Sequence, residues 1–406
     1  MQNKRINVGD FRIGLEDREA INGVLDSRRL SEGMRVREFE QKWAKYIGAK
    51  YCIATSSGSG ALIVGLTALK YCRNLSIGTK VITTPLTYIA DSSAISVVGF
   101  DPVYVDVDPL TFNITAKAIE AYLEQVKDLD KHAIILPVDL MGFPVEIDKI
   151  NKIAEKYGLL VFEDPAQAHG TVYKGHKAGS QALLADYSFY IAHNIQAGEM
   201  GAIVTNDLEI DRLARKIKAQ GRACDCLVCT RSEGCCPQLK AYHGKDDFDP
   251  RFTHDLIGYN FKTMEFQAAL ALIQIKNVDK IIAKRQRNVR YLNTELEEYK
   301  EILQLPLYSN EVSYLAYPLV IKKPDVISRK ELRGKLEKFG VETRPLFGCI
   351  PTQQPAYGYL KEEYKDKLPN ADYIGKNGFY VGCHQYLEEE DLEYIVRVFQ
   401  KILEEV

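Results

Sequence analysis

Short apolar, β-branched runs alternate with amphipathic stretches through the first half of the chain. Runs with strand character stand at 51–55, 80–84, 102–107, 133–140, 159–164, 187–191 and 202–206. Helical patterns lie between most of them, for example at 61–71 and 147–158. This alternation predicts βαβ units and a mostly parallel sheet, and the unbroken apolar runs indicate strands that are buried on both faces.

The regular pattern stops in a loop and then resumes. Residues 221–257 are rich in Cys, Gly and Asp and show no clear period. Helical patterning returns at 263–304, and it is followed by a strand pattern near 313–322. Two further helices are predicted near 328–338 and 387–404.

A chain of 406 residues is too long for one compact core, so two domains are expected. We assign 1–30 to an N-terminal arm and 31–290 to a large domain. The Cys-rich segment 221–257 is an insert in that domain. Residues 291–406 form a smaller C-terminal α/β domain.

Composition narrows the range of partners. The formal net charge is −2, and no basic stripe predicts contact with a nucleic acid. No run of 18 apolar residues predicts a membrane span, and the first residues lack the apolar core of a secretory signal. We therefore expect a cytoplasmic enzyme that uses neither a membrane nor nucleic acid.

Five of the nine cysteines fall within 13 residues, at Cys224, Cys226, Cys229, Cys235 and Cys236. A local cluster of this kind in a large cytosolic chain indicates metal or redox chemistry more than a disulfide framework.

The first strand runs through SSGSGAL directly into a helix. Ser57, Gly58 and Ser59 are placed to hold a phosphate at the helix N-terminus. The motif is neither a Walker A loop nor GxGxxG, and a simple strand-to-helix turn is the alternative.

A second candidate follows the strand at 159–164, which ends in Glu163 and Asp164. A carboxylate at the carboxyl end of a parallel strand could hold a pyridinium N–H. The alternative is that Asp164 caps the next turn.

Taken together, several segments resemble the DegT/DnrJ/EryC1/StrS sugar aminotransferase family over nearly the whole chain. The segments include TSSGSGAL, TTPLTYIADSSAI, FEDPAQAHG, YSFYIAHN and IGYNFKTMEFQAAL. The resemblance implies the fold-type I (aspartate aminotransferase) fold of pyridoxal phosphate (PLP) enzymes. It also implies activity on nucleotide-linked keto sugars.

By this resemblance, one group of residues binds the cofactor. Ser59 and Ser188, with Gly58, would hold its phosphate, and Asn260 would reach it from a neighbouring subunit, which implies a homodimer with shared sites. Tyr88 would stack on the pyridine ring. Asp164 would pair with the ring nitrogen and Gln167 would approach the 3′-oxygen.

One position departs from the aminotransferases of the family. Their Schiff-base lysine is replaced here by His193, and no lysine occurs from 187 to 215. Imidazole cannot bind the cofactor aldehyde covalently, but it can move a proton near neutral pH. A dead enzyme or a purely structural histidine is the alternative.

The lysine-to-histidine exchange resembles the nucleotide-sugar 3-dehydrases, which use pyridoxamine phosphate (PMP). The resemblance implies that His193 is the general base in loss of the C3 hydroxyl from a 4-keto-6-deoxy sugar. One subgroup regains its amine from glutamate. The other reduces its intermediate through an iron–sulfur cluster that a reductase, ferredoxin or flavodoxin supplies with electrons.

The cysteine cluster resembles the insert of the iron–sulfur subgroup. Cys224, Cys226, Cys229 and either Cys235 or Cys236 would supply four thiolates, with a 2Fe–2S cluster favoured. One difference is Ala166, where the CDP-sugar enzyme of that subgroup carries a further cysteine. Structural zinc would use the same thiolates.

Arg344 is a candidate for the diphosphate of the sugar nucleotide, because a guanidinium fork matches phosphate oxygens. An ordinary surface arginine is the alternative, and His384 is expected to pack. Two other functions stay open, namely a glutamate-coupled dehydratase or aminotransferase with zinc at its cysteines, and a non-catalytic paralogue.

Overall fold

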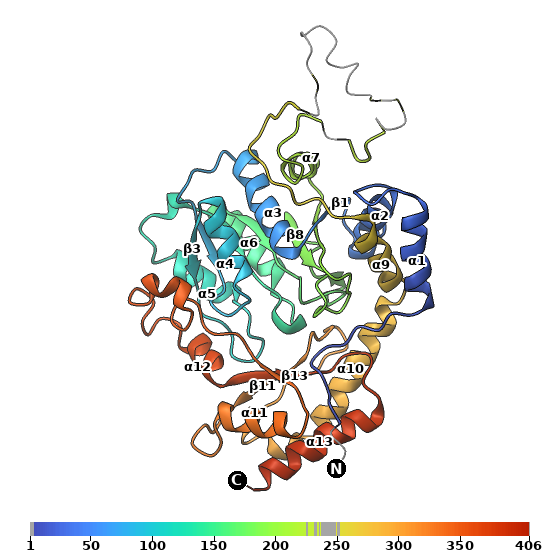
Figure 1. Ribbon diagram of the computed structural model, residues 1–406. Helices are drawn as coiled ribbons and strands as arrows, with labels where there is room; N and C mark the ends of the chain where they lie inside the picture. The colour runs from blue at the N-terminus through green and yellow to red at the C-terminus, as the bar shows by residue number, and fades with distance from the viewer. Residues whose placement is uncertain are drawn as a thin grey trace.

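The computed structural model describes residues 4–224, 226–230, 234, 236, 249 and 252–405. It confirms the predicted α/β class. A seven-stranded sheet and a four-stranded sheet are both flanked by helices (Figure 1). Among the described residues, no helix combines the length and the apolar character that crossing a membrane requires.

The seven-stranded sheet is mostly parallel. Its strands are β1 (Tyr51–Thr55), β2 (Lys80–Thr83), β3 (Asp101–Tyr104), β4 (His132–Leu136), β5 (Leu160–Glu163), β8 (Leu184–Ser188) and β9 (Gly201–Thr205). They lie in the order β1-β9-β8-β5-β4-β2-β3, and β9 alone runs antiparallel to its neighbours in this sheet. A separate hairpin pairs β6 (Val172–Tyr173) with β7 (His176–Lys177).

Helices of the first three quarters of the chain surround this sheet. They are α1 (Leu15–Asp26), α2 (Met34–Ile47), α3 (Gly58–Cys72), α4 (Ala90–Val98), α5 (Ala116–Leu123), α6 (Ile147–Tyr157), α7 (Leu208–Ile217), α9 (Glu265–Lys276) and α10 (Val278–Glu295). On one face of the sheet, Ile53, Ile134 and Phe162 pack with α3, α4 and α7. On the other face, β1, β8 and β9 pack against α2 and α9. Both faces are therefore buried, as the apolar runs predict.

One strand lies three residues earlier than the sequence pattern predicts. The apolar run at 187–191 favours a strand there, but β8 spans Leu184–Ser188 and contains Asp186. Aspartate is rare in strand interiors, so the pattern misplaces the strand. Asp186 is nevertheless buried in this strand.

The smaller sheet is antiparallel and is formed by the last part of the chain. Its strands are β10 (Leu303–Gln304), β11 (Tyr317–Ile321), β12 (Thr343–Pro345) and β13 (Gly378–Val381), in the order β10-β11-β13-β12. The accompanying helices are α11 (Arg329–Lys338), α12 (Pro369–Asn377) and α13 (Glu389–Leu403). Figure 1 shows these helices gathered below the larger sheet, near both ends of the chain.

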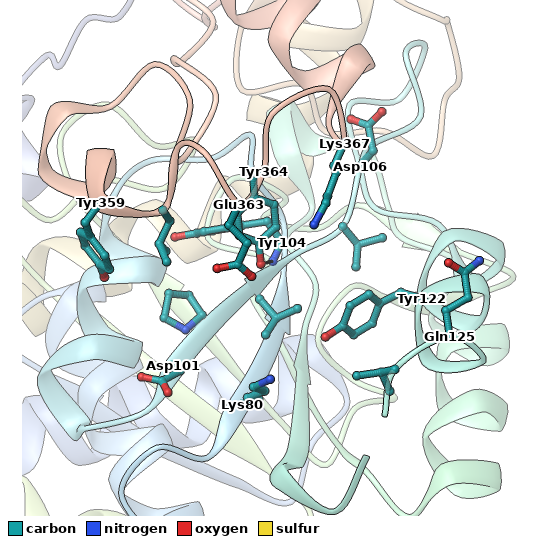
Figure 2. A pocket seen from close by; sticks show the side chains of 15 residues that line it. Lys80, Asp101, Tyr104, Asp106, Tyr122, Gln125, Tyr359, Glu363, Tyr364 and Lys367 are labelled. Carbon is teal, nitrogen blue, oxygen red and sulfur yellow. Dashed lines mark hydrogen bonds between the residues drawn. The ribbon is translucent and has the colours of Figure 1, made fainter. Parts of the chain in front are cut away.

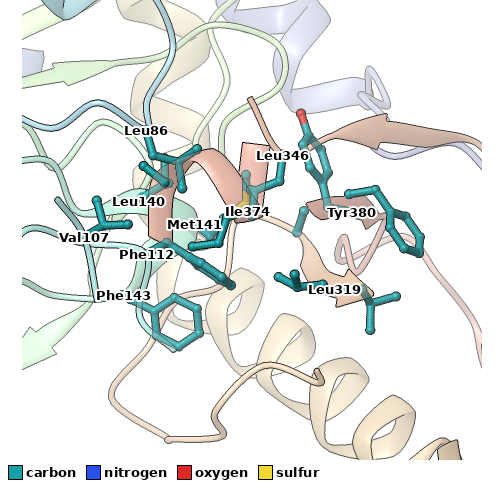
Figure 3. Packing of buried hydrophobic residues seen from close by; sticks show 14 of the residues in the cluster. Leu86, Val107, Phe112, Leu140, Met141, Phe143, Leu319, Leu346, Ile374 and Tyr380 are labelled. Carbon is teal, nitrogen blue, oxygen red and sulfur yellow. The ribbon is translucent and has the colours of Figure 1, made fainter. Parts of the chain in front are cut away.

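The two sheets share a continuous hydrophobic cluster. Leu86, Leu140 and Met141 from the larger sheet's loops belong to the same buried cluster as Leu346 and Ile374 from the C-terminal part (Figure 3). Helix α10 runs without a break across residue 290, and Ile6 forms a bridge with Val341. The boundary between a large and a small domain at residue 290 stays a prediction.

A buried ion-pair network joins α2, α7 and β1. Arg215, which is only 6% exposed, donates from Nε to Asp211 and from Nη1 to Glu40, both at 3.0 Å. Its Nη2 donates to the carbonyl oxygen of Cys52 at 2.8 Å. Glu40 in turn accepts the N–H of Ala54 at 2.9 Å. The network thereby anchors the strand that leads into the turn before α3.

Arg215→Met is expected to lower the free energy of unfolding by about 3–5 kcal/mol, because Glu40 and Asp211 stay buried after losing this partner. The matched control is Lys42→Met, which removes an exposed pair with Glu38 at 2.7 Å on α2. That loss is expected to be below about 1 kcal/mol. Urea denaturation measures both, and equal losses would contradict the assigned role of the network.

Candidate active site

The residues predicted to bind the cofactor ring and phosphate come to one edge of the seven-stranded sheet. Strands β1, β2, β4, β5 and β8 run in the same direction, so their carboxyl ends meet at this edge. Tyr88 follows β2, Asp164 follows β5 and Ser188 ends β8. This is the edge at which open α/β sheets bind ligands.

The turn between β1 and α3 closes tightly on the end of β8. Ser57 caps α3, because its Oγ accepts the N–H of Gly60 at 3.0 Å. A Cβ atom at Gly58 would lie 2.5 Å from Ser188 Cβ, so only glycine permits this approach. The first N–H groups of α3 lack intrahelical acceptors and carry the positive end of the helix dipole. The turn is therefore suited to a phosphate.

Two further predicted phosphate ligands lie at the surface. Ser59 is exposed in the first turn of α3. Asn260 is also exposed, and its Oδ1 accepts a hydrogen bond from the Lys262 ammonium group at 2.6 Å. The next residue contacts the phosphate turn, since the Phe261 carbonyl oxygen accepts the N–H of Ser56 at 2.8 Å. The role of Asn260 in a neighbouring subunit stays a prediction.

Asp164 belongs to a group of five buried carboxyl groups. Asp91, Asp139, Glu163, Asp164 and Asp186 are each at most 6% exposed. Burial raises the pKa of all five, and that of Glu163 to about 7. Among the described residues, neither carboxyl oxygen of Asp186 has a hydrogen-bond partner. Such a group is stabilised by protons or by a cationic ligand.

The other two predicted ring contacts present suitable groups. The Oε1 of Gln167 accepts the N–H of Met141 at 3.0 Å, which leaves the side-chain amide nitrogen to donate to a ligand. Tyr88 is 61% exposed, and its ring centroid lies 6.2 Å from that of Phe347 in an edge-to-face arrangement. Its ring is therefore open for stacking.

His193 lies in the loop after β8, beside a second histidine. Its ring centroid is 5.8 Å from that of the fully buried His169. The Nδ1 of His193 is buried without a hydrogen-bond partner in the described part of the chain. Burial and the positive charge of Arg285 lower the pKa of His193 to about 4. The imidazole is therefore neutral at pH 7 and can accept a proton.

The sequence pattern misses Arg285. This residue on α10 is 2% exposed and donates to the carbonyl oxygens of Tyr314 at 3.2 Å and Leu315 at 2.8 Å. Its charge also contributes, after burial, to lowering the pKa of His384 to about 4. A charged residue in an amphipathic helix is normally solvent-facing, so nothing in the sequence distinguishes it.

The predicted metal ligands do not form a site among the described residues. Cys224 and Cys236 are partly buried, whereas Cys226 and Cys229 are exposed. Cys235 lies outside the described residues. No three His, Cys, Asp or Glu side chains in the described ranges are grouped so that they could hold a metal ion. The predicted iron–sulfur or zinc site therefore gains no support from the structure.

The two candidates from the C-terminal part differ in exposure. Arg344 on β12 is exposed, and its Nε and Nη2 both donate to Glu342 at 3.3 Å. His384 is buried, and its Nε2 lies 3.2 Å from the carbonyl oxygen of Asn7. These contacts give His384 a packing role, as predicted, and leave Arg344 available at the surface.

A cavity of about 640 Å³ lies elsewhere, along β3 at the outer edge of the sheet. Figure 2 shows it between β3 and the segment that carries Tyr359 and Glu363. None of the predicted site residues lines it. Several of its polar groups are already paired, since Tyr104 donates to Ser92 at 2.9 Å and Lys80 pairs with Asp128 at 2.8 Å.

The fold and the arrangement of this edge define a fold-type I PLP-dependent enzyme. Residues 12–400 match the model described as the DegT/DnrJ/EryC1/StrS aminotransferase family. The chain belongs to this family.

Several relatives with different names match most of the chain. Lipopolysaccharide biosynthesis protein RfbH of Salmonella typhimurium is 30% identical over 406 residues, covering 97% of this chain and 90% of that protein. GDP-4-keto-6-deoxy-D-mannose 3-dehydratase of Escherichia coli O55:H7 is 30% identical over 387 residues, covering 94% and 96%. A solved structure of GDP-4-keto-6-deoxymannose-3-dehydratase with a trapped PLP-glutamate geminal diamine matches with a TM-score of 0.85. It is 27% identical and covers 97% of this chain and 100% of that chain.

The residues at this edge fit the B6 cofactor of the family. The glycine cradle at Gly58 is suited to a phosphate, and the buried carboxyl groups around Asp164 are suited to a protonated pyridine nitrogen. No lysine occurs from 187 to 215, and the exchange of the family's Schiff-base lysine for His193 stays a prediction.

The buried carboxyl groups predict a pH dependence of stability. The pKa of Glu163 rises from 4.5 to about 7 on folding, so its stabilising contribution is complete below the lower value and is lost as the pH rises through 7. Cofactor-free protein is expected to lose on the order of a few kcal/mol of unfolding free energy between about pH 5 and 8. Urea unfolding at a series of pH values measures the decline. Glu163→Gln cannot ionise and should flatten it, and an equal decline in the variant would contradict the assignment.

Proposed function

We propose that the protein is a PMP- or PLP-dependent 3-dehydratase of a nucleotide-linked 4-keto-6-deoxy sugar. The observation that carries this proposal is a neutral imidazole, His193, where the aminotransferases of the family have a Schiff-base lysine. The relative named GDP-4-keto-6-deoxy-D-mannose 3-dehydratase supports the reaction type. The base of the nucleotide and the configuration of the sugar are left open.

The chain's own residues would hold the cofactor at three points. Gly58, Ser59 and Ser188 would bind its phosphate, and Asp164 would pair with the ring nitrogen. The Gln167 amide would donate to the 3′-oxygen. When bound, the cofactor supplies an amine that condenses with the sugar ketone and a ring that withdraws electrons.

His193 supplies the proton transfer. The imidazole carries a lone pair on one ring nitrogen at neutral pH, because burial and Arg285 disfavour the imidazolium form. The imidazole can therefore remove a proton from the reacting centre and return it to the departing C3 hydroxyl group. A lysine in this place would compete for the cofactor aldehyde, which an imidazole cannot do.

Glutamate is the amine donor that the comparisons favour. The solved 3-dehydratase with trapped PLP and glutamate supports renewal of the amine without electron transfer. The second candidate is one-electron reduction through an iron–sulfur cluster at Cys224, Cys226, Cys229 and Cys235 or Cys236, fed by a reductase. The clustering of these cysteines in the sequence is the observation that favours it.

A homodimer with shared sites belongs to the same proposal. Asn260 is exposed and its partner Lys262 is partly buried, close to the phosphate turn, where a second subunit could receive them. Arg344 would bind the diphosphate of the sugar nucleotide after exchanging its bond to Glu342.

Substitution of His193 tests whether its imidazole is the general base of the elimination. His193→Asn is expected to bind PMP as the wild type does and to eliminate the C3 hydroxyl at least about 100-fold more slowly. His193→Lys should in addition bind PLP covalently, which borohydride reduction and intact-protein mass spectrometry detect. A His193→Asn variant that eliminates at the wild-type rate would refute the role of the imidazole.

Substitution of the cysteines distinguishes amine renewal from glutamate from one-electron reduction through an iron–sulfur cluster. Anaerobically purified protein is expected to turn over with glutamate and no reductant. Cys224→Ser should keep this activity within about twofold, because the thiol takes no part in proton transfer. Iron that is stoichiometric in the wild type and absent from Cys224→Ser and Cys226→Ser, with visible absorption that dithionite bleaches, would favour the iron–sulfur candidate instead.

A further inference from the structure

The carboxyl group of Asp91 lies directly against that of Asp164. Asp91 is in the first turn of α4 and is 1% exposed. Its Oδ2 accepts the hydroxyl of Thr87 at 2.8 Å. Its other oxygen, Oδ1, is buried and receives no N–H or O–H donor from the described residues. The side chains of Asp91 and Asp164 are hydrogen-bonding partners, and two carboxyl groups can pair in this way only through a proton held between them.

Two carboxylates in contact inside a protein cannot both be ionised. In the described part of the chain, the other charged group that acts on the pair is Asp186 on β8, a third buried carboxyl group that adds no compensating positive charge. One proton must therefore be retained in the pair. Burial raises the pKa of both groups, and the hydrogen bond between them raises that of Asp91 further while it offsets part of the rise at Asp164.

Backbone hydrogen bonds fix the orientation of Asp164. Asp164 Oδ1 accepts the N–H of Ala166 at 2.8 Å, which stabilises the ionised form of Asp164. The loop that holds Asp164 is fixed by its backbone as well, because its N–H donates to the Pro137 carbonyl oxygen at 2.8 Å. Asp164 is thus held in one orientation by its loop, with Asp91 as its side-chain neighbour.

We propose that Asp91 is a positioning residue that stays protonated and donates its carboxyl proton to Asp164, so that Asp164 remains the anion that faces the cofactor's ring nitrogen. Thr87 fixes Asp91 by donating to its second oxygen. The pair carries one negative charge in total, which matches the single positive charge of a protonated pyridine ring. This inference rests on the proposed function only in that a B6 ring occupies the site.

The arrangement has a consequence for electron withdrawal by the ring. An Asp164 that took up a proton itself would no longer stabilise the protonated ring nitrogen. Asp91 prevents this by holding the proton on the far side of the pair. Asparagine at position 91 can reproduce that donor, since its amide N–H₂ can donate to Asp164 while its oxygen accepts from Thr87.

The experiment compares Asp91→Asn with Asp91→Ala in the full-length protein. The probes are PMP and an analogue whose ring nitrogen is replaced by C–H, with dissociation constants measured by equilibrium dialysis. Asp91→Asn is expected to bind PMP within about threefold of the wild type, whereas Asp91→Ala should lose about tenfold or more through the missing bond to a charged group. The analogue, which lacks the ring nitrogen, should bind both variants and the wild type about equally well.

Asp17→Asn serves as the matched control, because it also neutralises a buried acid, on α1, and leaves the pair of Asp91 and Asp164 intact. Its affinity for PMP should follow that of the wild type. The infrared carbonyl band of an un-ionised carboxyl group gives a readout without ligand, and Asp91→Asn should reduce it. This measurement also keeps the proposal testable where Asp91→Ala fails to fold.

Three results would overturn the proposal. The first is an Asp91→Asn variant as impaired as Asp91→Ala, which would mean that an ionised Asp91 is required. The second is equal loss of affinity for PMP and the analogue in Asp91→Ala, which would indicate a structural role. The third is an unchanged infrared band. Wild-type protein that binds PMP as expected but does not dehydrate any sugar nucleotide would refute the proposed function alone.

Discussion

The site depends on five carboxyl groups buried where parallel strands end. Such groups are tolerated only with protons or with a cation beside them. The described residues supply no buried arginine or lysine partner to the pair of Asp91 and Asp164, so the pair retains one proton and is stabilised further by a positive charge beside it. A protonated pyridine ring answers that requirement, and the phosphate turn at Gly58 lies on the same edge of the sheet.

A buried positive charge controls the protonation of the histidines in the site. Arg285 is buried against backbone carbonyl oxygens, and its charge disfavours protonation of His193 and His169. The site therefore combines carboxyl groups whose pKa values are raised with histidines whose pKa values are lowered. This division separates the group that stabilises the ring from the group that moves a proton, which a dehydration requires.

Much of the architecture was predictable because it follows from local patterns. Six strands of the larger sheet and the helices α3, α6, α11 and α13 stand where apolar periodicity predicts them, since packing of both sheet faces requires continuous apolar runs. The exception is β8, where Asp186 interrupts the pattern. A buried acid in a strand is stable only in the company of other groups that are distant in sequence, and a pattern of neighbours cannot reveal them.

Sequence alone was enough for the α/β class and the family resemblance, and it predicts a phosphate turn at Gly58 and an exchange of lysine for His193, because each is a matter of residue type at a given place. Tertiary packing alone decided the protonation states. Asp91, Asp164 and Arg285 come from a helix, a strand-end loop and another helix that lie far apart along the chain. Their charges act on one another only because folding removes water from between them and lowers the local dielectric.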